Sequence, residues 1–296
     1  MKTAASRSSL ETLLADDVPY GDLTTEALGI GDRPGLMRFE ARDPMVLALA
    51  EDAATLLELA GCEVDLHAKS GSRLAPGAAI LTARGDAASL LRGWKVAQTL
   101  IEVWSGVATS ARAIVEAARA VSPKMAVACT RKNIPGTKCF AAAAVKAGGA
   151  VMHRLGLSET VLVFPEHREF LRDQALAETV SRLRRGAPEK KLVIEVATAE
   201  LGVEAAIAGF DVVQAEKFSP AAIASLVAQL KSLGHIQTRL PIVAAAGGIN
   251  AENVAAYARA GADLVVTSSP YLARPCDVQV KISSASVGLQ ALTAAA

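Results

Sequence analysis

Four side chains that can carry positive charge follow two apolar segments in the middle of the chain. Arg131 and Lys132 come after Met125–Cys129, and His153 and Arg154 come after the next short apolar segment. A single cation after a strand is most often a solvated loop charge, but two pairs in succession are harder to explain that way. The carboxyl ends of parallel strands face one mouth, where ligands bind. Cations gathered there predict an anionic ligand, either a phosphate or a carboxylate.

Two carboxylates follow later apolar segments of the same kind. Glu195 ends the run Leu192-Val-Ile-Glu, and Glu216 ends the run Val212-Val-Gln-Ala-Glu. Carboxylates at strand ends are suited to holding Mg²⁺ and the hydroxyls of a sugar. Either acid alone would be equally well explained as a structural salt-bridge partner. Because they stand at successive strand ends, we expect them to share the mouth with the cations.

A pair of glycines marks a third strand end. Gly247-Gly248 follows an apolar run and precedes a helix that we expect to begin near Asn250. Such a loop offers free backbone N–H groups and a helix N-terminus to a phosphate, although a lone glycine pair is more often only a turn. Ser268, at the next strand end, adds a hydroxyl donor. Phosphate sites built from the last two strand–helix loops recur in barrels.

The elements that must position these residues alternate regularly after residue 120. Short, continuously apolar segments separated by helices are typical of parallel βαβ units, which an α/β barrel closes. Residues 161–163 either extend the second strand or form a strand of their own. The pattern predicts about six strands, over 125–129, 151–154, 191–196, 211–215, 241–246 and 263–267.

The first third of the chain has a different pattern, which predicts a small α/β unit of mainly antiparallel character. The expected strands lie on both sides of Asp43-Pro44 and over 62–67 and 79–84, with a helix over 51–60. Residues 277–282 alternate like an edge strand and are expected to pack back on this unit.

Two long helices, over 90–100 and 105–120, are expected to connect this unit to the barrel. The predicted domains are therefore residues 1–107, joined by the C-terminal segment 271–296, and the barrel over 108–270.

Composition agrees with such a protein and excludes others. At 296 residues, the chain can form one large barrel or two domains. Apolar residues make up 51% of it and aromatic residues only 4%, which suits short buried strands covered by alanine-rich helices. A net charge of +1 provides no general attraction to nucleic acid or to an anionic membrane, so any anion site must be local.

The four cysteines form no C-x-x-C pair and no zinc-binding spacing with the histidines, which is typical of reduced thiols in a cytoplasmic protein. Neither an apolar leader at the N-terminus nor a membrane span is expected.

The chemistry-bearing segments resemble, in order and over nearly the whole chain, those of the nicotinate-nucleotide pyrophosphorylase (quinolinate phosphoribosyltransferase) family. The resemblance implies an open-faced α/β sandwich plus a barrel of about six strands, in a homodimer whose sites lie at the interface. It also implies phosphoribosyl pyrophosphate and Mg²⁺ as reactants. The segments that carry it are Gly21-Asp-Leu-Thr-Thr25, Ser105-Gly-Val-Ala-Thr109, Thr130-Arg-Lys with Pro135-Gly136, Gly148-Gly with His153-Arg-Leu-Gly-Leu157, Glu195, Glu216 and Gly247-Gly-Ile.

Residues at three places in the chain depart from the family pattern and resemble the ModD group of paralogues, which are associated with molybdate transport and use. Lys95 stands where the family has an arginine, Phe164 replaces a lysine that binds a substrate carboxylate, and Glu216-Lys217 replaces Asp-Asn. Losing that lysine removes a charge-assisted contact worth about 1.5–3 kcal/mol. Replacing arginine by lysine loses the planar fork that binds a carboxylate through two hydrogen bonds. The acceptor is therefore expected to be less anionic than quinolinate, with one acidic group and an aromatic or apolar face.

The resemblance also implies roles for the individual residues. Lys132 would contact the departing pyrophosphate, and Glu195 and Glu216 would hold Mg²⁺ and the ribose hydroxyls. The 5′-phosphate would be bound by Gly247, Gly248 and Ser268. The acidic group of the acceptor would be bound by Arg131, His153 and Arg154, beside the apolar wall of Phe164 and with Lys95 from the other subunit.

Three functions remain open at this level. The first is a phosphoribosyltransferase with an unidentified acceptor and a possible link to molybdenum. The second is quinolinate phosphoribosyltransferase itself, in NAD biosynthesis, which Phe164 and Lys95 argue against. The third is a non-catalytic protein that binds an oxyanion such as molybdate. Such a receptor gains nothing from carboxylates that face its ligand, so Glu195 and Glu216 favour an enzyme.

Overall fold

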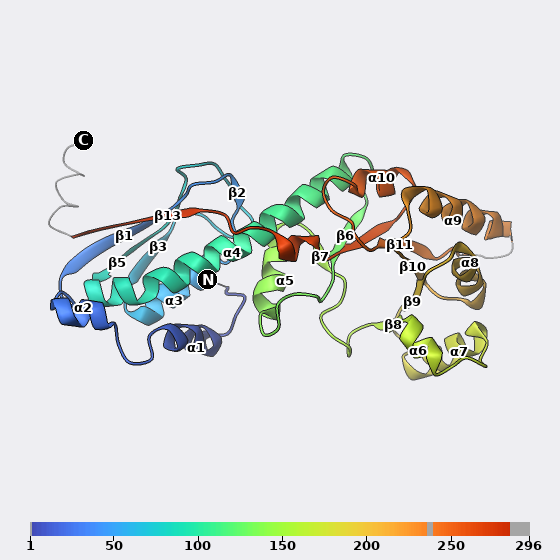
Figure 1. Ribbon diagram of the computed structural model, residues 1–296, viewed down its shortest axis with the longest axis horizontal. Helices are drawn as coiled ribbons and strands as arrows, with labels where there is room; N and C mark the ends of the chain where they lie inside the picture. The colour runs from blue at the N-terminus through green and yellow to red at the C-terminus, as the bar shows by residue number, and fades with distance from the viewer. Residues whose placement is uncertain (1, 236–238, 285–296) are drawn as a thin grey trace. The chain divides into compact units, whose positions relative to one another are not determined.

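The computed structural model describes residues 2–235 and 239–284 and divides into two compact units (Figure 1). Unit 1 consists of the chain up to Ser110, residues 135–149 and the segment that begins at Leu272. Unit 2 consists of residues 111–134 and 150–271. Residues 135–149 therefore belong to unit 1 although they lie between two strands of unit 2. The small, apolar residues from Leu289 onward predict a frayed end of the chain, and they lie outside the described residues.

Unit 1 is built on a four-stranded antiparallel sheet in the order β13-β1-β5-β3. The expected edge strand is confirmed, because β13 pairs along β1 with Phe39 opposite Val280. The strands of this sheet are β1 (Pro34–Ala41), β3 (Glu63–Leu66), β5 (Ala79–Asp86) and β13 (Val278–Ser284). The other elements of the unit are helices α1 (Arg7–Asp17), α2 (Leu23–Leu28), α3 (Ala50–Ala60), α4 (Ala87–Arg119, which continues into unit 2) and α5 (Lys138–Ala147), and the short strands β2 (Met45–Val46) and β4 (Arg73–Leu74).

The two faces of this sheet differ, as an open-faced sandwich requires. Met37 and Phe39 on β1 are fully buried in a core that includes Leu57 of α3 and Ile101 of α4. The intervening side chains of β1 point the other way and form ion pairs, with the Glu40 carboxylate 2.8 Å from Lys281 Nζ on β13. The predicted fold class of this unit is therefore confirmed.

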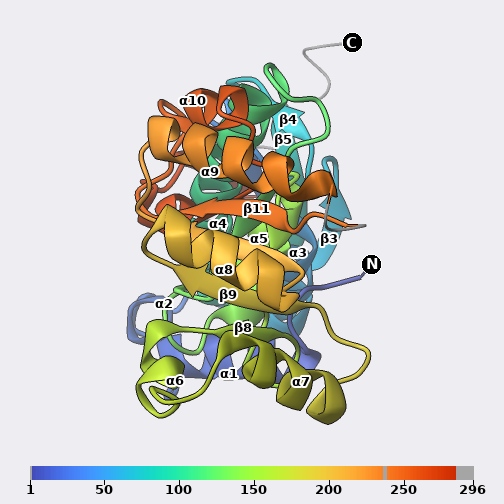
Figure 2. The ribbon, with the colours of Figure 1, turned by 90° about the vertical axis from the view of Figure 1, so that its right-hand side faces the viewer.

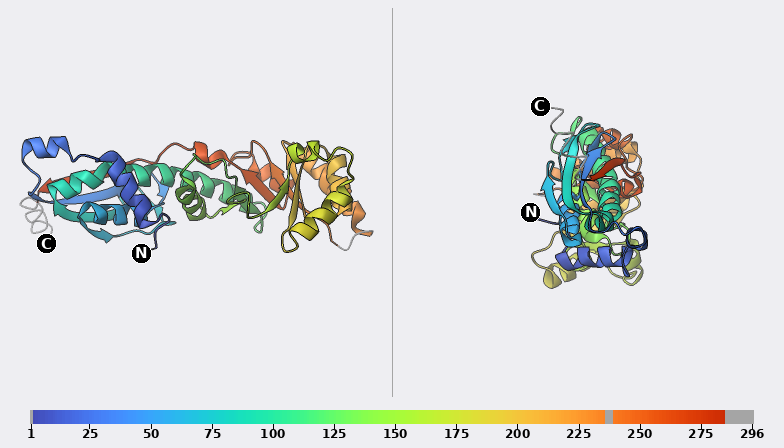
Figure 3. Two further views of the ribbon diagram at one scale, coloured as in Figure 1. Left: turned by 90° about the horizontal axis from the view of Figure 1, so that it is seen from below. Right: turned by 90° about the vertical axis from the view of Figure 1, so that its left-hand side faces the viewer.

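One expectation about unit 1 is wrong, because the two predicted helices over 90–100 and 105–120 are one continuous helix, α4, of 33 residues (Figures 1 and 3). Ser105 does not interrupt it, since its hydroxyl accepts a hydrogen bond from Ala48 N at 3.0 Å. Gly106 stays helical because it lies against another segment. A Cβ atom there would lie 2.2 Å from the carbonyl oxygen of Arg274.

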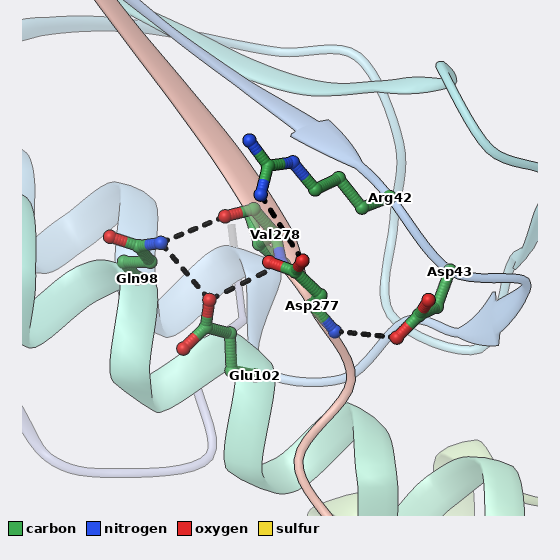
Figure 4. A network of polar contacts seen from close by, with 6 residues as sticks. All are labelled: Arg42, Asp43, Gln98, Glu102, Asp277 and Val278. Carbon is green, nitrogen blue, oxygen red and sulfur yellow. Dashed lines mark hydrogen bonds and ion pairs between the residues drawn. The ribbon is translucent and has the colours of Figure 1, made fainter.

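Polar contacts fix the C-terminal strand to α4 (Figure 4). Gln98 Nε2 donates hydrogen bonds to the Val278 carbonyl oxygen at 2.8 Å and to Glu102 Oε1 at 3.0 Å. The same carboxylate oxygen accepts the N–H of Val278 at 3.2 Å. Beside them, Arg42 Nη1 lies 3.3 Å from the Asp277 carboxylate. These bonds pair backbone groups of β13 where it approaches the helix.

Unit 2 is a parallel α/β sheet of the barrel type, which confirms the predicted class. Its order is β7-β6-β12-β11-β10-β9-β8, so it has seven strands rather than about six. Residues 161–163 are the additional strand, which pairs with β9 and not with β7. The strands are β6 (Ala126–Cys129), β7 (Val151–Met152), β8 (Val161–Val163), β9 (Leu192–Val196), β10 (Val212–Glu216), β11 (Ile242–Ala246) and β12 (Leu264–Thr267).

Helices α7, α8 and α9 lie side by side over the outer face of this sheet (Figure 2). The inner face is lined by small and branched apolar side chains, with Val212, Ala244, Ala246 and Val266 forming a buried cluster. The helical elements of the unit are α6 (Pro165–Glu169), α7 (Leu176–Gly186), α8 (Ala199–Ala208), α9 (Pro220–Ser232) and α10 (Val254–Arg259), with 3₁₀ turns η1 (Leu233–His235) and η2 (Ser269–Leu272, whose last residue belongs to unit 1).

The close approach at Gly106 gives a test of the continuous helix. We expect Gly106→Ala to lower the free energy of unfolding by about 2–3 kcal/mol, because the added methyl group must push the Arg274 backbone away from α4. Gly186→Ala, in α7, is the matched control, since a Cβ there meets nothing within 4 Å. It should be neutral or stabilising by up to about 1 kcal/mol. Urea denaturation measures both, and equal effects would contradict the predicted contact.

Candidate active site

The cationic residues gather at the carboxyl ends of β6 and β7, which are adjacent parallel strands. Cys129 on β6 is level with Met152 on β7, and His153 N donates a hydrogen bond to the Cys129 carbonyl oxygen at 2.8 Å. Arg131 and Lys132 therefore follow one strand where His153 and Arg154 follow its neighbour. Arg131 and Lys132 are exposed, whereas Arg154 is buried, with 8% of its surface accessible.

Electrostatics at Arg154 and His153 indicate a local excess of positive charge. Burial lowers the pKa of Arg154, and the charge of Arg131 lowers it further, while Glu195 acts in the opposite direction. Burial, and then the charge of Arg154, also lower the pKa of His153, which favours the neutral imidazole. An anion bound here would relieve the repulsion between the two guanidinium groups.

The two acids lie on the neighbouring strands β9 and β10. Glu195 is half-buried and accepts a hydrogen bond from Gln214 Nε2 at 2.7 Å. Burial raises the pKa of Glu195, and so does the negative charge of Glu216, while the Gln214 hydrogen bond and Lys132 lower it. The Glu195 carboxylate therefore interacts electrostatically with both Glu216 and Lys132. The structure brings the two groups together, as their strand-end positions predicted.

This pair of acids fits one mode of magnesium binding better than another. Among the residues that the structure describes, no three His, Cys, Asp or Glu side chains are grouped to hold a metal ion. Mg²⁺ is commonly bound through one or two carboxylates together with the phosphates of a substrate, rather than in an all-protein cage. Glu195 and Glu216 suit that shared arrangement, in which the cation also offsets their mutual repulsion.

Phe164 lies between the ends of the two edge strands of the sheet. It follows β8, and its ring centroid is 5.1 Å from the guanidinium carbon of Arg154, which follows β7. On α6, the His167 ring stacks with Phe164 at 5.9 Å, and its Nδ1 accepts the Phe164 N–H at 2.9 Å. Nothing in the sequence pattern assigns His167 a role, because its contact with Phe164 depends on the turn into α6. The contacts make Phe164 a fixed aromatic wall.

The glycine pair lies at the end of β11, in a conformation that requires glycine. Gly247 and Gly248 have φ angles of 93° and 70°. A Cβ on Gly247 would lie 2.8 Å from Lys217 Cγ, whereas Gly248 meets nothing within 4 Å. The loop is therefore packed on one side against the residue that follows Glu216 and is open on the other.

The helix after this loop begins later than the sequence predicted, at Val254 rather than near Asn250. The Asn250 side chain accepts the N–H groups of Glu252 and Asn253, which holds these residues in a turn. Thr267 Oγ1 donates to the Ile249 carbonyl oxygen at 2.6 Å and ties the loop to β12. Ser268, the next residue, is half-buried at the end of that strand.

Lys95 belongs to a different unit of the chain from the other predicted site residues. It belongs to unit 1, on α4, where its Nζ lies 4.1 Å from the Trp94 ring centroid and 3.2 Å from Gln98 Oε1. The other predicted site residues all belong to unit 2. Its assignment to a neighbouring subunit's site stays a prediction.

Sequence reasoning missed two polar residues of the mouth. Gln214 lies inside an apolar strand and contacts Glu195, and Glu166 on α6 is close enough to raise the pKa of Glu195. An amide in the otherwise apolar run of β10 was the available signal for the first. A cavity of about 550 Å³ at the amino ends of the strands is lined mainly by apolar residues such as Leu230 and Leu264, and brings together none of these groups.

A parallel barrel-type sheet with cations, paired acids and a glycine loop at its carboxyl ends offers the groups that bind anionic, phosphorylated ligands. Residues 22–105 match the family described as quinolinate phosphoribosyl transferase, N-terminal domain, and residues 107–281 match its C-terminal domain. The chain belongs to the quinolinate phosphoribosyl transferase family, and it is a phosphoribosyltransferase of the ModD pyrophosphorylase type.

Relatives in two groups support this placement. "Putative pyrophosphorylase ModD" of Rhodobacter capsulatus is 48% identical, over 86% of this chain and 96% of that protein. The protein of the same name from Escherichia coli O6:H1 is 37% identical, over 95% and 98%. "Probable nicotinate-nucleotide pyrophosphorylase [carboxylating]" of Archaeoglobus fulgidus is 31% identical, over 86% and 94%.

Solved structures share the fold. NadC from Streptococcus pyogenes superposes with a TM-score of 0.84 at 24% identity, over 94% of this chain and 96% of that one. The nicotinate-nucleotide pyrophosphorylase from Francisella tularensis gives 0.81 at 22% identity, over 94% and 95%. In the described part of the chain, no helix is both long and apolar enough to cross a bilayer.

The glycine loop gives a test of its packing against Lys217. We expect Gly247→Ala to lower the free energy of unfolding by about 3 kcal/mol, from backbone strain at positive φ plus the overlap with Lys217. Gly248→Ala carries the strain without the overlap, so it should cost about 1 kcal/mol. Chemical denaturation of the two variants separates these contributions. Indistinguishable stabilities would show that the loop is not packed in this way.

Proposed function

We propose that this enzyme transfers phosphoribose from phosphoribosyl pyrophosphate to an acceptor that combines an aromatic face with a single acidic group. The observation that carries the proposal is the contrast between the two halves of the mouth. Glu195 and Glu216, with Lys132 and the Gly247-Gly248 loop, supply every type of group that a sugar pyrophosphate requires. The wall at Phe164 is aromatic and carries no charge of its own, and the cation beside it is the guanidinium of Arg154, 5.1 Å from the ring centroid.

The phosphoribosyl half would work through charge. In the reaction, the bond from ribose C1 to pyrophosphate breaks and its electrons leave with the pyrophosphate, while the acceptor's lone pair forms the new bond at C1. Lys132 would stabilise the departing charge. Glu195 and Glu216 would hold the ribose hydroxyls and stabilise the positive charge that develops at C1. Mg²⁺ bound by these acids would screen the pyrophosphate.

The same half would anchor the far end of the sugar. Gly248 leaves open space beside the loop, and Ser268 follows the adjacent strand. Backbone N–H groups of Gly247 and Gly248 and the Ser268 hydroxyl would bind the 5′-phosphate. The loop is short and tied to β12 through Thr267, so little order would have to be created on binding.

The acceptor half would recognise one negative charge and one flat face. Arg131, His153 and Arg154 would bind the acidic group, with Lys95 from the second subunit of a homodimer. An aromatic ring would pack on Phe164, which such contacts favour by about 0.5–1.5 kcal/mol. Arg154 would already be engaged by the first acidic group, so a dicarboxylate would place its second charge against a ring that supplies no further cation.

Two other functions are less well supported. Quinolinate as the acceptor would follow the names of the nicotinate-nucleotide pyrophosphorylase relatives, but it would need a cation in place of Phe164. A receptor for an oxyanion such as molybdate would have Glu195 and Glu216 repelling its ligand. A molybdenum link rests on the ModD name of the relatives alone. No particular residue of this chain is the basis for it. A cytoplasmic location would suit the phosphorylated substrates.

The acceptor half can be tested by restoring the missing cation. We expect Phe164→Lys to bind quinolinate at least about 10-fold more tightly than the wild type in calorimetric titrations with phosphoribosyl pyrophosphate and Mg²⁺ present, because a charge-assisted contact is worth about 1.5–3 kcal/mol. Phe170→Lys is the control, since the Phe170 side chain is 90% exposed. Efficient turnover of quinolinate by the wild type would refute this assignment of the acceptor.

A further inference from the structure

Gln214 is a polar side chain enclosed in the inner wall of unit 2. Only 4% of its surface is accessible, and the strand residues around it, Val212, Val213 and Ala215, are buried as well. Residues two apart on a strand share a face, so Gln214 lies on the inner face with Val212 and Glu216.

Strand register places Gln214 directly beside Glu195. The two residues are paired across β10 and β9, and on its other side Gln214 is level with Ala244 of β11. The alanine methyl group leaves the amide room inside the barrel. Gln214 Nε2 donates to Glu195 Oε2 at 2.7 Å.

The amide oxygen has no comparable partner. Gln214 Oε1 is buried and, among the described residues, accepts no hydrogen bond. A buried acceptor without a donor is costly, and an apolar side chain of similar size would avoid that cost. A glutamine in this position therefore indicates that its N–H group has a use which outweighs the loss.

That use concerns the orientation of the Glu195 carboxylate. Glu216 and Glu166 repel it, while Lys132 and Arg154 attract it, so charges act on it from several elements. Such forces do not by themselves fix a rotamer. Within the described part of the chain, the hydrogen bond from Gln214 is the directional contact that this carboxylate receives.

We propose that Gln214 is a positioning residue, which holds Oε2 of Glu195 and leaves Oε1 of that carboxylate for a ribose hydroxyl or for Mg²⁺. The inference rests on the proposed binding of phosphoribosyl pyrophosphate. It adds Gln214, on the strand next to that of Glu195, as the residue that orients the Glu195 carboxylate before the substrate binds.

The test compares the affinity for phosphoribosyl pyrophosphate with Mg²⁺, measured by titration calorimetry on the full chain. Gln214→Met keeps the length and volume of the side chain but removes the amide, and should weaken binding about 10- to 100-fold, the range expected for losing a hydrogen bond to a charged group. The matched control is Gln174→Met, because Gln174 also has a buried, unpaired amide nitrogen but contacts Arg182 instead. Its affinity should equal that of the wild type.

A second comparison separates positioning from a general effect on packing. In a Glu195→Gln background, Gln214→Met should weaken binding by less than about 2-fold further, because residues that act through one another are not additive. Effects that multiply would overturn the positioning role. If Gln214→Met does not fold, Gln214→Asn serves instead, since its shorter side chain withdraws the amide from Glu195.

The outcomes for the two proposals are distinct. A wild type that does not bind phosphoribosyl pyrophosphate would overturn the proposed function. A wild type that binds it, together with a Gln214→Met variant of equal affinity, would overturn the role of Gln214 alone.

Discussion

The repulsion between Glu195 and Glu216 is the constraint on which the mouth of unit 2 depends. Both acids are half-buried on neighbouring strands, and burial together with the negative charge of Glu216 raises the pKa of Glu195. The hydrogen bond from Gln214 and the charge of Lys132 oppose this rise in the pKa of Glu195, and Arg154 also interacts with the Glu195 charge. A divalent cation would offset the negative charge of the two acids, and a polyanionic substrate would offset the positive charge of Lys132 and Arg154.

Parallel register and small side chains make this arrangement possible. Glu195, Gln214 and Ala244 form one row across three strands. Glu216 and Ala246, two residues further along their strands, belong to the next row on the same face. Ala244 beside Gln214 and Ala246 beside Glu216 take up less volume on this face than larger residues would. The glycine loop adds a backbone that approaches Lys217 more closely than any side chain would permit. The site therefore depends on the positions at which the strands end and on the small side chains of their inner faces.

The sequence predicted the parts of this account that depend on local pattern. Apolar runs that end in Glu195, Glu216 or the cations indicated both the strands and the mouth they share, because strand ends on one side of a parallel sheet meet. It failed where distant residues decide. Ser105 and Gly106 suggested a helix break, yet contacts with Ala48 and the Arg274 backbone keep α4 continuous. Gln214 looked like part of an apolar strand, because its role depends on a hydrogen bond to Glu195 of β9, which is distant in the sequence. Lys95 has a predicted role that depends on a second chain, which no pattern within one chain can establish.

Titration of the full chain with phosphoribosyl pyrophosphate, once with Mg²⁺ and once with a chelator, tests the central claim most directly. If the acids and cations form a site for this substrate, calorimetry should give saturable binding of one molecule per chain with Mg²⁺ and much weaker binding after chelation. Absence of binding under both conditions, or an affinity that Mg²⁺ leaves unchanged, would contradict the assignment of Glu195 and Glu216.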